Sequence, residues 1–95
     1  AVEAMESHVA DPLDLDQLAG IAGVSARQMN RLFTDQLGQS AMRYYRALRL
    51  GRAQSLLRNS SLSLTQIALA TGFANSSHFS RAYSAQFGQP PSQYR

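Results

Sequence analysis

The side chains with the clearest chemical potential in this sequence are arginines on two short stretches that each follow a glycine. The first stretch, GVSARQMNRLFTDQLGQS, runs from Gly23 to Ser40, and the second, GFANSSHFSRAYSAQFGQP, runs from Gly72 to Pro90. A guanidinium group donates hydrogen bonds in a planar fork that matches phosphate oxygens and the O6 and N7 atoms of guanine. The chemistry suggested is therefore recognition of an anionic polymer rather than the making or breaking of bonds.

Catalysis and metal binding find little support in the residue pattern. Ser76, Ser77 and His78 are consecutive, so on one helix they cannot face each other as nucleophile and base. No paired carboxylates occur in the basic half, and no glycine-rich phosphate cradle is present. Two isolated histidines and no cysteine provide too few ligands for a zinc site. We expect no enzyme, no cofactor and no metal.

Charge is divided unevenly along the 95 residues. All six acids precede Gln36 together with two arginines, whereas the other seven arginines follow it, and lysine is absent. The polarity predicts a polyanionic partner, although the preference for arginine over lysine is explained equally well by a GC-rich genome. No apolar run is long enough to span a bilayer and no signal peptide pattern occurs, so we expect a cytoplasmic protein without membrane contact.

The chain also repeats itself at a spacing of 49 residues, and of 50 after one extra loop residue. Ten identities support an internal duplication, which predicts a tandem pair of modules. The matched pairs are Leu13 and Leu62, Leu15 and Leu64, Gln17 and Gln66, Ala19 and Ala68, Gly23 and Gly72, Arg31 and Arg81, Gln36 and Gln86, Gly38 and Gly88, Gln39 and Gln89, and Tyr44 and Tyr94.

Each module reads as a helix, a tight turn and a second helix. In the first, Asp14 or Asp16 caps a helix to about Ala22, Gly23 ends it, and Ser25 caps a helix to about residue 37. The second module repeats this plan, with caps at Ser63 and Asn75 and glycines at 72 and 88. The expected inward residues are Leu15, Leu18, Ala19, Ala22, Met29, Leu32 and Phe33, then Ile67, Ala68, Phe73, Phe79, Ala82, Tyr83 and Phe87.

A longer helix from about Ala41 to Leu57, capped by Ser40, connects the modules. Its apolar residues cover much of its circumference, so it is expected to pack against both modules. Arg49 lies among them and would need a carboxylate or carbonyl partner, which makes it structural. Tyr44 and its counterpart Tyr94 are expected to pack the ends of their modules. A short amphipathic helix at residues 2–9 and a last turn at residues 91–95 complete the chain.

A glycine-containing turn that joins a short helix to an arginine-bearing one is typical of a helix-turn-helix, and two copies make the interpretation stronger. The stretch LSLTQIALATGFANSSHFSRAYSAQFGQPPSQYR and the segment RLGRAQSLL (Arg49 to Leu57) resemble the DNA-binding domain of AraC/XylS-family transcription regulators. The resemblance covers nearly the whole chain. Ala41 departs from it, where proline is common, and so does Asn75, where an acid is frequent.

The resemblance implies an all-α fold of seven helices, with two three-helix modules joined by a long connecting helix. We expect one compact unit made of a first module (1–40), the connecting helix (41–58) and a second module (59–95). The implied function is sequence-specific binding of double-stranded DNA, with two recognition helices in successive major grooves. The resemblance further implies that the chain is a fragment of a larger bacterial regulator. The missing part is expected to sense an effector or to dimerise, and the opening of the chain resembles members in which that part is amidotransferase-like. The whole regulator is expected to contact RNA polymerase.

The residues expected to contact DNA follow from the outward faces of the two arginine-bearing helices and from the family pattern. The expected base readers are Arg27, Asn30, Arg31, Ser76, Ser77, His78 and Arg81. The expected phosphate contacts are Ser25, Gln28, Thr34, Ser40, Arg43, Arg46, Arg52, Asn75 and Ser80.

Three alternatives stay open. Arg31 or Arg81 could pair with Asp35 or with a helix end instead of DNA. Only one module could insert fully into a groove. The whole domain could instead be a helical protein-interaction module that uses its arginines to bind an acidic partner.

Overall fold

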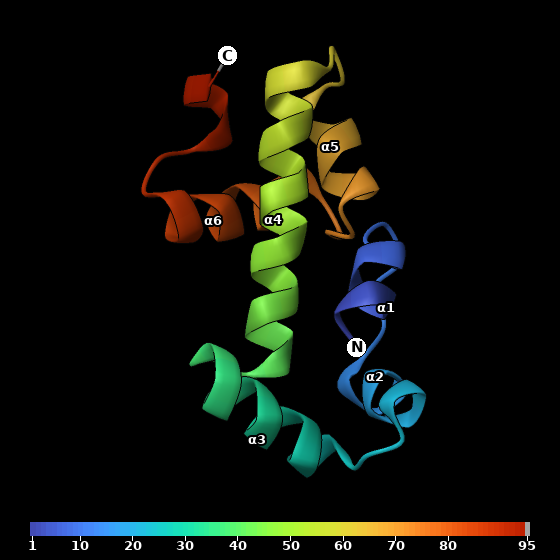
Figure 1. Ribbon diagram of the computed structural model, residues 1–95. Coiled ribbons are helices and arrows are strands. Elements are labelled where there is room, and N and C mark those ends of the chain that lie inside the picture. The colour runs from blue at the N-terminus through green and yellow to red at the C-terminus, as the bar shows by residue number, and fades with distance from the viewer. Residues whose placement is uncertain (95) are drawn as a thin grey trace.

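The computed structural model describes residues 1–94, with Tyr94 described by its backbone only. Six α-helices and a final 3-10 turn make up this part of the chain, which contains no strand. The all-α class is confirmed, but the expected seventh helix is a 3-10 turn. The elements are α1 (Val2–Ser7), α2 (Leu15–Ala22), α3 (Ala26–Leu37), α4 (Ala41–Asn59), α5 (Leu64–Ala70), α6 (Ser76–Phe87) and η1 (Pro91–Tyr94) (Figure 1).

Side-chain caps explain where five of the helices begin. Asp14, not Asp16, caps α2, and its carboxylate accepts a hydrogen bond from the Gln17 amide at 2.8 Å. Ser25 and Ser63 form the same reciprocal capping box at the starts of α3 and α5. Because these caps satisfy amides that have no partner within the helix, they fix each helix start from the local sequence.

α4 carries both modules. Its 19 residues span about 28 Å at 1.5 Å per residue. Ala41 and Tyr45, near its start, belong to the core of the first module, while Leu50, Ala53 and Leu57 belong to the core of the second. One helix therefore takes part in two hydrophobic cores, as the sequence predicted.

The core of the first module is smaller than the sequence suggested. Met29 and Phe33 of α3 are buried, but Leu32, which the helical stripe placed beside them, is 48% exposed. Ala22 is exposed as well. Both expectations were wrong because no described helix covers this side of the module, which instead forms an open groove.

The loop before α2 and the middle of α4 meet the turn of the second module. The Tyr45 hydroxyl accepts a hydrogen bond from the Leu13 amide at 3.1 Å and donates one to the His8 carbonyl. Arg49 lies one turn further along α4 and donates to the carbonyls of Thr71 (3.2 Å) and Gly72 (3.0 Å). These bonds tie residues far apart in the sequence to one side of α4.

Arg49 is held by more than its hydrogen bonds. Its guanidinium lies 4.6 Å from the centre of the Phe73 ring and 5.7 Å from that of Tyr45, which favours cation–π contact. Burial lowers the pKa of the Arg49 guanidinium from its ordinary value. The expectation that Arg49 is structural and needs carbonyl partners is confirmed.

Gly72 completes this junction. Its φ of +84° lies in the left-handed region, and a Cβ there would lie 2.5 Å from Pro12 Cγ and 2.6 Å from the Val9 carbonyl oxygen. No other residue type fits this backbone and this close approach together. The turn of the second module is therefore packed directly on the segment that precedes α2.

Tyr44 packs the end of the first module through an edge-on contact with Phe33, with ring centres 5.5 Å apart, as expected. The side chain of its counterpart Tyr94, and the whole of Arg95, lie outside the described residues. None of the described helices combines the length and apolar character needed to cross a bilayer.

Candidate nucleic-acid interface

The two arginine-bearing helices are mounted on the same connecting helix. Figure 1 shows α3 lying across one end of α4 and α6 lying across α4 part of the way along it, with the two helices running in a similar direction. Each follows a short helix and a turn that ends in a cap, Ser25 for α3 and Asn75 for α6. The second helix of each helix-turn-helix is the one that enters the DNA major groove in this class of motif.

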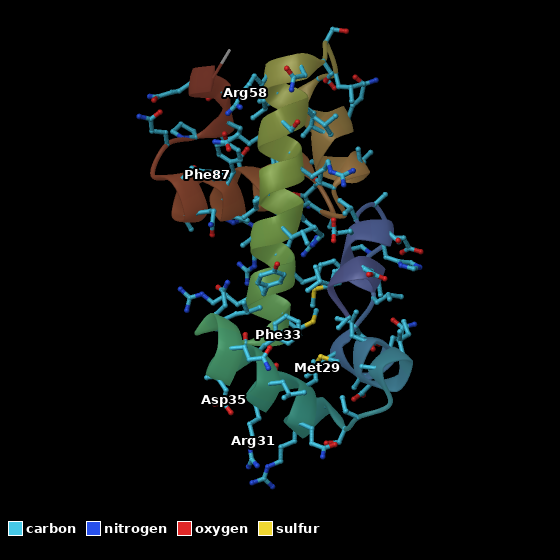
Figure 2. All side chains as sticks on the ribbon, viewed as in Figure 1. Met29, Arg31, Phe33, Asp35, Arg58 and Phe87 are labelled. Carbon is cyan, nitrogen blue, oxygen red and sulfur yellow. The ribbon has the colours of Figure 1, made fainter. Side chains whose placement is uncertain are left out.

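On α3, Arg27 and Arg31 are exposed and one helical turn apart, so they lie on one face. Figure 2 shows Arg31 extending from α3 away from the rest of the molecule. Asp35 follows one turn later, yet Arg31 forms no ion pair within 4.0 Å with any described residue. The structure thus gives no support to the alternative that Arg31 is occupied by Asp35.

Asn30 has a partner within the protein. Its Oδ1 accepts a hydrogen bond from the Ala41 amide at 3.0 Å, and the residue is half-buried. Two-point recognition of adenine uses the Asn oxygen as acceptor and the amide nitrogen as donor. This hydrogen bond fixes α3 against α4, and the role of Asn30 as a base reader stays a prediction.

On α6, Ser77, His78 and Arg81 are exposed, whereas Ser76 and Ser80 are half-buried. Arg81 is the counterpart of Arg31 and forms no ion pair with a described residue either. The His78 ring lies edge-on to Phe73, with ring centres 5.6 Å apart. That contact limits the reach of His78, so Ser77 and Arg81 are the most available side chains on this helix.

The cap residues keep donors available for phosphate. The side-chain oxygens of Ser25, Ser40 and Asn75 each accept a hydrogen bond from an amide in the first turn of the helix that follows. Their remaining polar hydrogens can still donate. The side-chain Nε2 of Gln28 can donate as well, while its Oε1 accepts a hydrogen bond from the Ser25 backbone amide. Phosphate oxygens only accept, so this leftover donor capacity is complementary to them. Thr34 is exposed on the same helix, α3.

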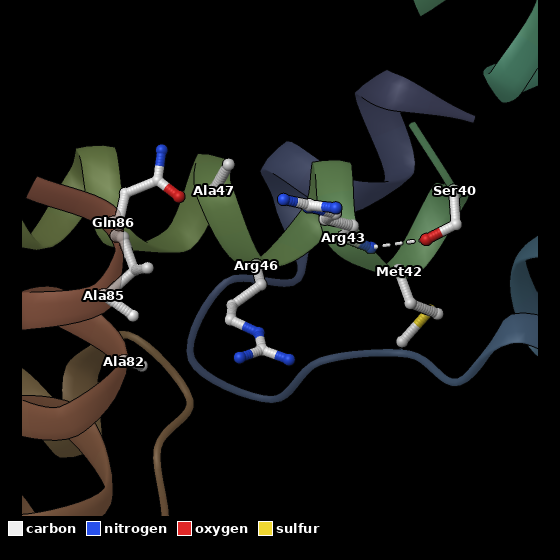
Figure 3. A pocket seen from close by; sticks show the side chains of 9 residues that line it. Ser40, Met42, Arg43, Arg46, Ala47, Ala82, Ala85 and Gln86 are labelled. Atoms are coloured by element: carbon white, nitrogen blue, oxygen red, sulfur yellow. Dashed lines mark hydrogen bonds between the residues drawn. The ribbon is translucent and has the colours of Figure 1, made fainter. Parts of the chain in front are cut away.

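A cleft of about 490 Å³ lies between the first half of α4 and α6. Figure 3 shows Arg46 extending from α4 across the opening, with Ala82, Ala85 and Gln86 of α6 on one side and Ser40 and Met42 on the other. Arg43 lines the same cleft, so two exposed guanidinium groups stand between the two recognition helices.

The structure does not bring Arg52 into this group. At 3.6 residues per turn it projects about 180° from Arg43 and about 120° from Arg46. Conversely, Gln86 lines the cleft although the sequence did not single it out as a contact. Its identity with Gln36 in the repeat was the available signal.

Comparison with known proteins identifies a domain family and several transcriptional regulators that are similar to this chain. A family model for a helix-turn-helix domain matches residues 18–95. The HTH-type transcriptional regulator GbdR of Pseudomonas aeruginosa is 45% identical over 94 residues, which cover 99% of this chain and 26% of that protein. GlxA of Rhizobium meliloti, also an HTH-type transcriptional regulator, is 43% identical over 94 residues, 99% of this chain and 29% of that protein. The chain thus spans between a quarter and a third of the length of these relatives.

Solved structures with a similar fold include DNA-binding domains of transcriptional regulators. A transcriptional regulator of the AraC-type DNA-binding domain-containing proteins from Chromobacterium violaceum is 44% identical, with a TM-score of 0.94 over 99% of this chain and 84% of that one. The DNA-binding domain of the global transcriptional factor AdpA, solved in complex with a target DNA, is 28% identical, with a TM-score of 0.89 over 98% of this chain and 83% of that one. The chain therefore belongs to the AraC-type helix-turn-helix DNA-binding domains of transcriptional regulators.

Proposed function

We propose that this domain reads duplex DNA with both modules, α3 and α6 each entering a major groove on one face of the duplex. The observation that carries the proposal is the pair Arg31 and Arg81. They occupy equivalent positions on the two helices, both are exposed, and neither forms an ion pair with a described residue. Two unpartnered arginines on duplicated helices suit two separate readings of guanine.

The modules have unequal roles. Arg27 and Arg31 give α3 two arginine readers, each contributing about 1–3 kcal/mol of discrimination when paired with guanine. α6 offers Arg81 with Ser77 and His78, whose short or partly packed side chains discriminate less. We infer that the first module supplies most of the specificity and the second adds fewer base contacts.

Phosphate contacts surround these readers. Arg43 and Arg46 in the cleft suit the stretch of backbone that runs between the two occupied grooves. Ser25, Ser40 and Asn75 would donate to phosphates at the helix starts, where backbone amides also point outward. Gln28, Thr34 and Ser80 remain further candidates for this role.

The spacing of the modules bears on the shape of the DNA. Two major grooves on one face of straight B-DNA lie about 34 Å apart, whereas the whole of α4 spans about 28 Å. α3 is hydrogen-bonded to α4 at Ala41, its first residue, and α6 lies beside Arg46, Ala47 and Leu50, so the two helices are attached to α4 at points closer together than its whole length. We infer that the DNA bends toward the protein, at a cost of about 1–6 kcal/mol. The alternative is that only the first module inserts fully.

The role of the whole regulator is also a proposal. We propose that residues 1–40, 41–58 and 59–95 act as one DNA-binding unit of a larger cytoplasmic protein that senses an effector or dimerises elsewhere and contacts RNA polymerase. The domain itself would bind rather than catalyse.

Measurement of duplex binding at several salt concentrations tests the proposal. We expect the logarithm of the binding constant to fall steeply and linearly with the logarithm of salt, since phosphate contacts release counterions. We also expect a preferred sequence to remain bound at salt concentrations that release random duplex. A helical module for acidic proteins would show neither steep salt dependence on DNA nor any preference among duplexes.

A further inference from the structure

Arg49 lies between the hydrophobic cores of the two modules. Its guanidinium is 4.6 Å from the centre of the Phe73 ring, which belongs to the second core, and 5.7 Å from that of Tyr45, which belongs to the first. One guanidinium nitrogen donates to the carbonyls of Thr71 and Gly72, while Nε has no hydrogen-bond partner among the described residues. No ion pair with a described carboxylate offsets the burial of its charge.

A half-buried guanidinium without a carboxylate is an unfavourable way to fill space. Removing the charge from water costs free energy that an apolar side chain of similar length would not lose. What the guanidinium adds is direction, because its planar group holds its donors at fixed angles and so fixes where the carbonyls of the turn lie. An arginine at position 49 therefore fits a geometric role better than a role in packing alone.

The turn that Arg49 holds determines where the second recognition helix begins. Ser76, the first residue of α6, lies only four residues after Gly72. Phe73, between them, is buried in the second core and contacts the guanidinium. Little chain is thus available to absorb a shift of the turn, so the position of the turn on α4 is passed on to α6.

Tyr45 holds the first module in the same way, one turn earlier on the same face of α4. Its hydroxyl donates to the His8 carbonyl and accepts from the Leu13 amide, two residues before α2 begins. In Figure 1 the segment after α1 lies beside the turn between α5 and α6, and Gly72 packs directly on this segment. Tyr45 and Arg49 therefore hold two elements that also contact each other, one from each module.

We propose that Tyr45 and Arg49 are positioning residues for DNA reading. By holding the entry to α2 and the entry to α6 on one face of α4, they set the separation and relative rotation of α3 and α6, and hence the spacing of base blocks that the domain accepts. The inference rests on the proposed reading of DNA by both modules. One base pair displaces a block by about 3.4 Å along the duplex and about 35° around it, so a small movement at the junction corresponds to a different spacing.

Two substitutions remove the polar contacts of the junction and keep its bulk. Tyr45→Phe removes the hydroxyl and retains the ring in the first core. Arg49→Met retains an unbranched side chain between the two rings and removes the charge and the donors. The control is Leu57→Val, which shortens a buried side chain of the second core two turns further along α4 and so lowers stability away from the junction.

The first measurement needs no DNA. Because the chain contains no cysteine, Asp35→Cys and Ala85→Cys place one spin label on each recognition helix, at equivalent and exposed positions. Pulsed electron–electron double resonance gives the distribution of distances between the two labels. We expect one narrow distribution in the unmodified domain and in Leu57→Val, and a broader or displaced distribution in Tyr45→Phe and Arg49→Met.

The second measurement uses duplexes that carry both preferred blocks, at their selected separation or with one base pair added or removed between them. In the unmodified domain and the control, the altered separation should weaken binding about tenfold, the loss expected when a base reader misses its base. In Tyr45→Phe and Arg49→Met it should weaken binding about threefold or less, because the second module can follow its block. Binding to a duplex that carries the first block alone should be the same in all four proteins.

The outcomes separate this inference from the function on which it rests. Junction variants that keep either the narrow distance distribution or the full dependence on block separation would overturn the positioning role and leave reading by two modules intact. Variants that lose affinity equally for every duplex, or a Leu57→Val control that behaves as they do, would assign the effect to stability and overturn it as well. An unmodified domain that is indifferent to block separation would instead overturn reading by two modules, and the positioning role with it.

Discussion

The side-chain oxygen of Asn30 accepts a hydrogen bond from the Ala41 amide at 3.0 Å, so the recognition helix α3 is bonded to the first residue of α4. In the second module the position of Ala41 is taken by Pro91, which has no amide hydrogen, and that of Asn30 by Ser80. The two differences are consistent with each other. In the first module Asn30 satisfies the Ala41 amide, and in the second module, where Pro91 has no amide hydrogen, the shorter Ser80 takes the place of the asparagine.

This relationship predicts a strong dependence of one substitution on the other. Asn30→Ala should cost about 1–3 kcal/mol of unfolding free energy, because the buried Ala41 amide loses its acceptor. In the Ala41→Pro background, which removes that amide at the first position of a helix where proline is favoured, the same change should cost much less. Denaturant unfolding of the four proteins measures the coupling, and equal costs in both backgrounds would contradict it.

A pair of glycine substitutions tests the junction between the modules. Gly38→Ala meets open space and should cost about 1–2 kcal/mol for its left-handed backbone alone, at φ +74°. Gly72→Ala adds a clash with Pro12 and the Val9 carbonyl, so it should cost about 1–3 kcal/mol more. Thermal or denaturant unfolding compares them directly. Similar losses would mean that the segment before α2 is not packed on the second module as described.

Arginines of the α4–α6 cleft should contribute to affinity without contributing to specificity. Arg43→Ala and Arg46→Ala should weaken binding to all duplexes alike and lower the magnitude of the salt slope by about 1 each. Arg52→Ala is the matched control, since it removes the same exposed charge from another side of α4. If Arg52→Ala changes the slope as much as the other two, net charge rather than the cleft determines it.

DNA bending follows from the short connecting helix. Because both recognition helices are attached to one helix that is about 28 Å long, a duplex bound by both modules should bend toward the protein. Energy transfer between dyes at the ends of a bound duplex, or gel mobility with the site placed at different positions, reports the bend. A straight duplex with two protected grooves would contradict the inference, and a straight duplex protected in one groove would favour insertion of the first module alone.

Features fixed by local sequence were predictable, and those that depend on distant neighbours were not. Caps such as Ser25 and Asn75 act on amides three residues away, so a pattern in the sequence locates them. The hydrogen bond that Asn30 accepts was not predicted, because its partner Ala41 lies eleven residues away at the start of another helix. Leu32 has the spacing of a core residue, but spacing says nothing about whether another helix is present to cover it.

The central claim is that two recognition helices read two separate blocks of sequence, the first through Arg31. Selection of bound duplexes from a random pool at about physiological salt tests it most directly, with the unmodified domain and Arg31→Ala side by side. We predict two short preferred blocks about 10 base pairs apart, with one base position relaxed by Arg31→Ala at a loss of about 1–3 kcal/mol. No enrichment, with binding that fades smoothly as salt rises, or a preference unchanged by Arg31→Ala, would contradict the account.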